Sequence, residues 1–379
     1  MQMRVALVSE SPIDFANGVA NSVVRTLEHL RRGGHDALVV APSPAPAEVA
    51  GYPAIGVRSI PLPRYRSYRL GLSTISYLQR VLDDYRPDIV HLAGPAVIGV
   101  AAIRAAKRLG LPTVAVFQTD AAGFAARHGL GMFGPFIWRE LRRLHNAADL
   151  TLVPSTDTRR QLEERGFTRM SLWRRGVDGE RFNPAHRDED LRRRLAPHGE
   201  TIIGYVGRLS REKRVHLLAH LAGLPDTKLV VVGDGPDAGL LRRRLPDAAY
   251  TGLQRGQALS KLVASLDVFV HTGANETYCQ AVQEALAAGV PVVAPAAGGP
   301  IDLVEPGRTG FLFAPDDTDA LRTAVQRLAA APDLCAEMGR RARASVEHRT
   351  WEAIGDELLD HYRSVLGRHD AGHRPATAR

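Results

Sequence analysis

Short apolar runs alternate with segments of helical period along almost the whole chain, and this alternation constrains the fold more than any other feature. Strands that alternate with helices predict βαβ units and a parallel sheet covered on both faces. Two helical segments in the first half, Val19–Arg31 and Ala96–Arg108, are followed by Gly, a helix stop signal. The apolar runs between such segments have the pattern of buried strands, bounded by Gly, Pro, Ser or Asp. In the first half they are Val5–Val8, Ala37–Val40, Ile89–Leu92, Thr113–Phe117 and Leu150–Val153.

The second half repeats this pattern. Its predicted strands are Ile202–Val206, Leu229–Val232, Val268–His271, Val290–Ala294 and Gly310–Phe313. Between the halves, the charged and Pro-containing stretch Asn183–Glu200 has no strand signal, and we expect an inter-domain connection there. The chain is therefore predicted to form two doubly wound α/β domains with a ligand in the cleft between them. We expect domains over 1–182 and 183–345, a helix over 346–368 that packs back on the first domain, and a tail over 369–379.

Composition excludes several classes of protein. Of 379 residues, 45% are hydrophobic and 24% charged, which excludes global disorder. No apolar run approaches the ~20 residues of a membrane-spanning helix, and the N-terminus lacks the features of a secretory signal. Two cysteines, Cys279 and Cys335, are too few for a disulfide framework. We therefore expect a cytoplasmic protein.

The net positive charge of the chain lies in the first half. Residues 1–185 hold 24 basic and 16 acidic side chains, whereas residues 186–379 hold 25 of each. A coding bias towards Arg explains why 45 of the 49 basic residues are Arg, but explains their uneven placement less well. The asymmetry favours an anionic membrane surface or lipid over nucleic acid as partner. Gly131–His145 could be an interfacial amphipathic helix, although a core-packed helix with a basic outer face is the commoner structure.

The most informative segment holds two glutamates. We expect a helix from about Glu276 to about Ala288, and Glu284 lies eight residues after Glu276. Eight helical residues span roughly 12 Å, whereas glycosidase carboxyl pairs lie about 5–9.5 Å apart. Two carboxylates that reach different parts of one elongated ligand fit better, with an ordinary exposed residue as the alternative for Glu284. A helix N-terminus suits a phosphate, and the amides available here are those of Thr277, Tyr278, Cys279 and Gln280.

A second segment places two cations at a strand-to-helix turn. In residues 202–214 a strand is followed by Gly207, a basic loop and a helix, with Arg208 and Lys213 five residues apart. Arg can hold a diphosphate as a fork and Lys as a point charge. Both would stabilise the charge of a departing diphosphate. The alternative is a solvated basic loop, against which the scarcity of Lys weighs modestly.

Three further positions follow predicted strands. Gly233 lets the backbone approach a ligand or only makes a tight turn. Gly18 opens a helix after a loop too long for a dinucleotide fingerprint, and either approaches a phosphate or is an N-cap. Asp120 ends the fourth strand segment, where it suits an active site or caps the next segment.

Together these segments resemble the retaining GT-B glycosyltransferases of family GT4, from the first strand to about Gly367. The family's E-x7-E pattern matches Glu276 and Glu284, and its G-R-L-x-x-E-K pattern matches residues 207–213. The V-G-D-G-P turn and the A-x-G-x-P-V-V-A strand also match. Within the family, NGVANSV, FQTDAAGFA, ETYCQ and AGGPIDLV are most similar to actinobacterial GDP-mannose-dependent α-mannosyltransferases, which act on lipid or glycolipid acceptors. The resemblance implies the GT-B fold, two Rossmann-like domains facing across a cleft.

The resemblance also implies residue roles. Arg208 and Lys213 would bind the donor diphosphate and stabilise it as leaving group, Glu276 would contact the sugar hydroxyls, and Glu284 would bond the ribose. The implied catalytic residues are Asp120, Arg208, Lys213 and Glu276. The implied donor-binding residues are Gly18, Gly207, Arg208, Lys213, Gly233, Glu276, Thr277, Tyr278, Cys279, Gln280 and Glu284.

Three positions depart from the family pattern. Asp120 lies near the position where many relatives carry a catalytic-site His, and we expect it to contact the sugar. Asn17 replaces the first glycine of the common Gly-Gly pair. Thr277 replaces the usual Gly after the first glutamate, which suggests a donor subset rather than loss of activity.

We therefore expect metal-independent, retaining transfer of mannose from GDP-mannose to a lipid or glycolipid acceptor, without a cofactor. A UDP-sugar-dependent transferase of the sulfolipid-synthase type and a sugar-nucleotide 2-epimerase are the alternatives. A dehydrogenase and a non-enzymatic sugar-nucleotide sensor fit less well. The acidic run 188–190 resembles the Asp-x-Asp of metal-dependent transferases, but we expect a solvated charge run. A peripheral position on the inner face of the plasma membrane remains a hypothesis.

Overall fold

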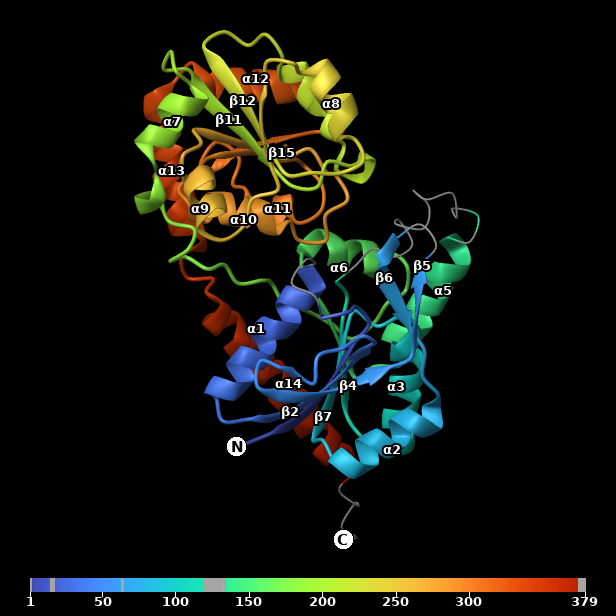
Figure 1. Cartoon of the computed structure of the whole chain (residues 1–379). Helices are drawn as coiled ribbons and strands as arrows, with labels where there is room; N and C mark the ends of the chain where they lie inside the picture. Colours follow the sequence, from blue (N-terminus) through green and yellow to red (C-terminus); the bar gives the residue numbers. More distant parts are fainter. Residues whose placement is uncertain (1, 14–17, 63–64, 119–131, 133, 374–379) are drawn as a thin grey trace. The chain divides into compact units, whose positions relative to one another are not determined.

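The computed structural model describes residues 2–13, 18–62, 65–118, 132 and 134–373. The chain forms two compact units. Unit 1 comprises residues 1–154, 158–174 and 351–379, and unit 2 comprises residues 155–157 and 175–350. Each unit has a sheet of its own (Figure 1).

Unit 1 is built on an eight-stranded sheet in the order β10-β9-β8-β7-β1-β2-β4-β3. All neighbours in it run parallel except β3 and β4. The chain extends the sheet from β1 in both directions, so a topological switch point lies between β1 and β7. The strands are β1 (Arg4–Ser9), β2 (Asp36–Pro42), β3 (Glu48–Val49), β4 (Tyr52–Val57), β7 (Ile89–Ala93), β8 (Thr113–Val116), β9 (Leu150–Val153) and β10 (Met170–Leu172). A separate antiparallel pair consists of β5 (Ser59–Leu62) and β6 (Tyr65–Gly71).

Helices cover both faces of this sheet. Successive β1 side chains point to opposite faces, so Val5 and Leu7 join the hydrophobic cluster with α1 and α14, while Ala6 and Val8 join the cluster with α2 and α3. The C-terminal helix α14, red in Figure 1, lies beside α1 within unit 1. The helices are α1 (Gly18–Arg32), α2 (Ile75–Tyr85), α3 (Val97–Arg108), α5 (Gly134–His145), α6 (Thr156–Glu163), whose first two residues belong to unit 2, and α14 (Trp351–His373).

Buried polar contacts attach α14 to the core of unit 1. The Tyr362 hydroxyl lies 2.7 Å from Nδ1 of His91 on β7. The Trp173 indole N–H donates to the Ile354 carbonyl at 2.9 Å. The helix ends at His373, five residues beyond the predicted end at residue 368.

Unit 2 has a six-stranded parallel sheet in the order β13-β12-β11-β14-β15-β16, with its switch point between β11 and β14. Its strands are β11 (Thr201–Val206), β12 (Thr227–Val232), β13 (Ala249–Gly252), β14 (Val268–Val270), β15 (Val292–Pro295) and β16 (Gly310–Phe313). Its α-helices are α7 (Glu189–Leu195), α8 (Ala238–Arg244), α9 (Gly256–Ala264), α10 (Gln280–Ala287), α11 (Pro300–Leu303), α12 (Thr318–Ala329) and α13 (Pro332–Val346). Three 3-10 helices are η3 (Pro184–His186), η4 (Arg211–Lys213) and η5 (Val215–Leu221).

The prediction of two Rossmann-like α/β domains with parallel sheets is confirmed. Each of the ten predicted apolar runs is a strand, with ends that differ by at most two residues. The strands that were not predicted are short, or carry Pro or charged residues in place of an apolar run. They are β3, β4, β5, β6, β10 and β13.

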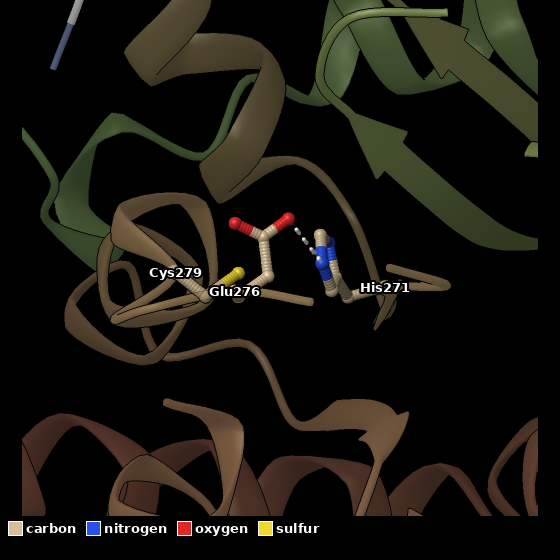
Figure 2. Close-up of side chains that lie close together, drawn as sticks. All are labelled: His271, Glu276 and Cys279. Carbon is tan, nitrogen blue, oxygen red and sulfur yellow. Dashed lines mark hydrogen bonds and ion pairs between the residues drawn. The ribbon is translucent and has the colours of Figure 1, made fainter. Parts of the chain in front are cut away.

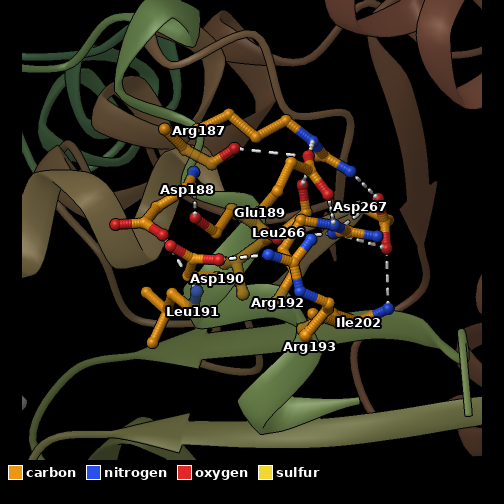
Figure 3. A network of polar contacts seen from close by, with 12 residues as sticks. Arg187, Asp188, Glu189, Asp190, Leu191, Arg192, Arg193, Ile202, Leu266 and Asp267 are labelled. Atoms are coloured by element: carbon orange, nitrogen blue, oxygen red, sulfur yellow. Dashed lines mark hydrogen bonds and ion pairs between the residues drawn. The ribbon is translucent and has the colours of Figure 1, made fainter. Parts of the chain in front are cut away.

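The expectation of an inter-domain connection over residues 183–200 is wrong, because this segment packs within unit 2. Arg187 and Arg192 both pair with the Asp267 carboxylate, at 2.7 and 3.0 Å, and Asp267 also accepts the Ile202 N–H (Figure 3). Upstream of it, Phe182 is buried in the unit 2 core. Apart from residues 155–157, the chain enters unit 2 between residues 174 and 175 and leaves it between residues 350 and 351, rather than at the expected boundaries.

The acidic run in this segment has structural partners rather than being only a solvated charge run. The Asp188 carboxylate caps α7 by accepting the Leu191 N–H at 2.9 Å, and it pairs with Lys261 at 3.4 Å. Asp190 pairs with Arg193 one turn along the helix. Figure 3 shows this acidic run beside the arginines that hold Asp267.

Candidate functional site

Most of the predicted site residues lie at the carboxyl ends of the strands at the unit 2 switch point. β11 and β14 pair in parallel, so the segments that follow them leave the same edge of the sheet. Gly207 and Arg208 follow β11, and His271 follows β14. In open α/β sheets this edge is where ligands bind.

A three-residue ionic cluster joins these segments. The Lys213 ammonium lies 2.5 Å from Oε1 of Glu276, and the His271 Nε2 lies 3.1 Å from the same oxygen. The Lys213 side chain is 30% exposed, whereas Glu276 is 13% and His271 is 3% exposed. Lys213 is thus the member of the cluster whose side chain is most exposed to solvent.

Mutual electrostatics fixes the charges of the cluster. Burial alone would raise the pKa of Glu276, but Lys213 and His271 outweigh burial and hold this pKa well below its ordinary value. Burial would lower the pKa of Lys213, but Glu276 raises it above its usual value. Burial also opposes protonation of His271, but Cys279 and Glu276 raise its pKa to about 10. Two cations therefore face one buried carboxylate.

Buried neighbours position the two loops that carry the cluster. The Tyr205 ring of β11 stacks on the His271 ring with centroids 6.4 Å apart, and its hydroxyl donates to the Arg208 carbonyl at 3.1 Å. The Thr272 hydroxyl donates to the Lys213 carbonyl at 2.7 Å. These contacts join the loop after β11 to the loop after β14.

The predicted start of the helix at Glu276 is wrong: α10 begins at Gln280, and Glu276 lies in the preceding loop. Cys279 is the N-cap with φ 77°, a left-handed conformation that interrupts a right-handed helix. The helical spacing assumed between Glu276 and Glu284 therefore does not apply.

Two glycines of the AGGPIDLV segment hold the Glu276 loop. The Gly299 N–H donates to the Glu276 carbonyl at 2.9 Å. A Cβ at Gly298 would lie 2.2 Å from that carbonyl oxygen, and one at Gly299 would lie 1.7 Å from the Tyr278 carbonyl oxygen. Asp157 accepts the Gly298 N–H at 2.8 Å. The glycines matched the family pattern, but nothing in the sequence pointed to Asp157.

Gly233 is required by backbone packing. A Cβ there would lie 1.9 Å from the Gly207 carbonyl oxygen, and its φ is 132°. The turn after β12 therefore packs directly against the loop that carries Arg208, whose side chain is exposed.

The start of α10 is hydrogen-bonded to the backbone at residues 175 and 176, which were not among the predicted site residues. The buried Tyr278 hydroxyl donates to the Arg175 carbonyl at 3.2 Å, and the Gln280 amide donates to the Gly176 carbonyl at 3.0 Å. Glu284 lies on α10, one helical turn after Gln280. Burial raises the pKa of Glu284 to about 7, with a lowering contribution from Arg181 and a raising one from Asp178.

Among the predicted site residues that belong to unit 1, Gly18 lies in the described part of the chain. Gly18 is the first residue of α1, and a Cβ added there would meet no atom within 4 Å. Asp120 and Asn17 lie outside the described residues.

One group in the described part of the chain has the composition and geometry of a metal-ligand set. His271, Glu276 and Cys279 each offer one ligand atom, and these atoms lie within 4.8 Å of one another. Figure 2 shows the Glu276 carboxylate between the Cys279 thiol and the His271 ring. Among the helices that the structure describes, none combines the length and apolar character needed to cross a bilayer.

Comparison with known proteins covers both units. Residues 16–181 match the family Glycosyltransferase Family 4, and residues 186–345 match Glycosyl transferases group 1. The chain is 47% identical over 380 residues to a GDP-mannose-dependent alpha-mannosyltransferase of Mycobacterium tuberculosis, covering 97% of this chain and 98% of that protein. It is 48% identical over 375 residues to the protein of the same name from Mycolicibacterium smegmatis, with coverage of 97% and 98%. Sucrose-phosphate synthase from Thermosynechococcus elongatus has a similar structure, with a TM-score of 0.82 at 20% identity over 97% of this chain and 100% of that one.

Proposed function

Because the chain belongs to glycosyltransferase family 4, we propose that it transfers mannose from GDP-mannose to a lipid or glycolipid acceptor, with retention and without a metal. The chain is a glycosyltransferase with the GT-B fold. Two relatives at 47% and 48% identity over nearly the whole chain are named GDP-mannose-dependent alpha-mannosyltransferases, which supports this donor. The observation that carries the proposal is the contact between Lys213 and Glu276, because it unites the two donor motifs in one site.

The cluster suits the two ends of a nucleotide-sugar diphosphate. Lys213 and His271 are two cations against the single Glu276 carboxylate. The partly exposed Lys213 side chain and the exposed Arg208, five residues before it in the same segment, would bind the diphosphate. The Glu276 carboxylate would then accept hydrogen bonds from sugar hydroxyls. Glu284, farther along the same segment, would bond the ribose.

The geometry supports a front-face mechanism. Glu276 is tied to two cations that hold its pKa low, so it is a poor nucleophile for the anomeric carbon. In the proposed step the bond from the anomeric carbon to the diphosphate oxygen breaks, and its electron pair goes to the diphosphate. The acceptor hydroxyl attacks from the same face and gives its proton to that departing oxygen. Lys213 and Arg208 stabilise the charge that develops there.

Unit 1 offers features that suit an anionic lipid surface. Helix α5 buries Leu141 and Leu144 but leaves Phe136 55% exposed, with Arg139 and Arg143 also exposed. The net positive charge of the chain, which residues 1–185 account for in full, points the same way. We propose a peripheral site on the inner face of the plasma membrane, where a lipid acceptor would be presented.

The donor and the reaction can be tested together. Purified protein is incubated with GDP-mannose, UDP-glucose or ADP-glucose and a bacterial lipid extract, with and without excess chelator. We expect a mannolipid from GDP-mannose alone, undiminished by chelator, with the α-anomeric linkage in its NMR spectrum. Transfer from UDP-glucose instead would contradict the proposed donor, and strict metal dependence would contradict the metal-independent reaction. A β-linkage would contradict retention. An epimerised nucleotide sugar formed without acceptor would contradict the transferase activity.

A further inference from the structure

We propose that His271, Glu276 and Cys279 bind a thiophilic divalent cation of the Zn²⁺ class, and that this cation inhibits the enzyme by displacing Lys213 from Glu276. The three ligand atoms come from one loop between β14 and α10, and they lie within 4.8 Å of one another. Figure 2 shows the three side chains close together, with the Glu276 carboxylate in contact with the His271 ring. The binding site stands by itself, whereas the inhibition rests on the proposed function.

The ligand set matches zinc in number and kind. Zn²⁺ takes His nitrogen, carboxylate oxygen and Cys sulfur at about 2.0–2.3 Å, which sets ligand atoms about 3.3–3.7 Å apart in a tetrahedron. The present spacing needs to contract by about 1 Å to reach those bond lengths, within the range of side-chain rotation. Three protein ligands leave the fourth position open, as in sites that hold water or substrate. A thiol and an imidazole in the set favour Zn²⁺ over Mg²⁺ or Ca²⁺, which prefer oxygen ligands.

The buried environment favours a ligand at this point. His271 is 3% exposed, and its Nε2 lies 3.1 Å from the Glu276 carboxylate. On binding, the His271 imidazolium and the Cys279 thiol would each release a proton. The thiolate, the Glu276 carboxylate and the neutral imidazole then carry the charge that balances a divalent cation. The loaded cluster would then be neutral, which matters because an uncompensated buried charge is costly.

The backbone does not explain the cysteine. Cys279 has φ 77°, and a left-handed conformation costs a residue with a Cβ ~1–2 kcal/mol relative to glycine. It is buried and forms no disulfide. A metal ligand is a role that glycine could not fill.

The cation and the Lys213 ammonium would compete for one oxygen. Lys213 lies 2.5 Å from Oε1 of Glu276, so a cation bound to that oxygen would stand in direct contact with the ammonium and repel it. Lys213 is partly exposed and can swing away. Binding would thereby withdraw both the diphosphate cation and the sugar-binding carboxylate from the donor site, and inhibition would be competitive with GDP-mannose.

Co²⁺ provides the direct test, because a thiolate bound to Co²⁺ gives a near-ultraviolet charge-transfer band. We expect the band, and one Zn²⁺ per chain by calorimetry, in the wild-type protein and in Cys335→Ser, which alters the other buried cysteine. Cys279→Ser should lose the band and weaken Zn²⁺ binding by more than the roughly 10–100-fold that loss of an outer-shell partner costs. Cys279→Gly, which suits the left-handed backbone, repeats the test in case the serine variant does not fold. A wild-type protein without the band, or a band kept in both Cys279 variants, overturns the site.

Two further measurements test the competition. Lys213→Ala should bind Zn²⁺ more tightly than the wild type, and unchanged or weaker binding would refute displacement of the ammonium. In the transfer assay Zn²⁺ should raise the apparent KM for GDP-mannose and chelator should restore it, in the wild type and in Cys335→Ser. Each variant is compared with itself with and without Zn²⁺, and Cys279→Gly should lose this sensitivity. Loss of mannosyl transfer altogether would refute the proposed function and leave the Co²⁺ result standing, whereas transfer that is indifferent to Zn²⁺ would refute only the inhibition.

Discussion

The two units share a topology but use the switch points of their sheets differently. In unit 1 the carboxylate of Glu10, just after β1, accepts the N–H groups of residues 96–99 at 2.8–3.2 Å and so occupies the N-terminal end of α3. In unit 2 the segments after β11 and β14 present Lys213 and His271 around Glu276, with the Lys213 side chain partly exposed. Unit 1 thus fills its anion-binding position with its own side chain, while unit 2 keeps cations available for a ligand. The same fold therefore makes a structural anchor in one unit and the proposed donor site in the other.

The largest expected effect is the loss of the cation in unit 2. Lys213→Ala should lower kcat by about 100- to 1000-fold, the usual cost of removing one group that stabilises a developing oxyanion. Lys261→Ala is the matched control, because Lys261 lies in unit 2 but pairs with Asp188. Turnover is measured with GDP-mannose, and folding by circular dichroism. Near-normal turnover of Lys213→Ala would refute the proposal that unit 2 stabilises the departing diphosphate.

A pH-dependent effect is expected from Glu284. Its pKa is raised from 4.5 to about 7, so the native state holds this proton more tightly than the unfolded chain. Stability contributed by this group is therefore full below pH 4.5, falls as the pH rises, and is lost above about pH 7. Glu284→Gln should remove this slope and be more stable than the wild type at pH 8, by up to about 3 kcal/mol.

Denaturant unfolding at pH 4.5, 6 and 8 measures the Glu284 effect. The control is Glu347→Gln, which changes an exposed carboxyl at the end of α13 in the same unit. Parallel pH slopes for Glu284→Gln and the wild type would show that the pKa of Glu284 is not raised in the folded protein.

The anchor of unit 1 should matter for stability. Glu10→Gln keeps the size of the side chain but brings an amide NH2 group against backbone N–H donors. Leaving buried donors unpaired should cost about 1–3 kcal/mol of unfolding free energy. Binding of GDP to unit 2 should change little at temperatures where the variant is folded. If the variant instead lost GDP affinity and kept full stability, the division of roles between the units would be wrong.

The smallest expected effect concerns the surface of unit 1. Replacing Arg139 and Arg143 with Gln removes two exposed cations, each worth about 1 kcal/mol near an anionic membrane. Sedimentation with anionic vesicles at low salt should fall several-fold. The matched control replaces Arg242 and Arg243 on α8 of unit 2 and should sediment like the wild type. Equal losses in both pairs would show that the charge of unit 1 has no special role.

Much of the fold was predictable, because the buried strands of each doubly wound unit are uninterrupted apolar runs in the sequence. Elements with weak local signals were missed: β10 has three residues, and β4 contains Pro53. The segment before β11 looked like a connection because its charges are dense. Only the pairing of Arg187 and Arg192 with Asp267, far along the chain, makes it part of unit 2.

The sequence by itself determined the fold class, the donor motifs and the family, because apolar periodicity and motif spacing are local properties of the chain. Tertiary structure decided how those motifs combine. Lys213 and Glu276 lie 63 residues apart and meet only because β11 and β14 are neighbours at a switch point. The left-handed Cys279 that starts α10 late has no sequence signal, since glycine is the residue expected in that conformation. The convergence of His271, Glu276 and Cys279 likewise depends on that turn, which only the folded chain shows.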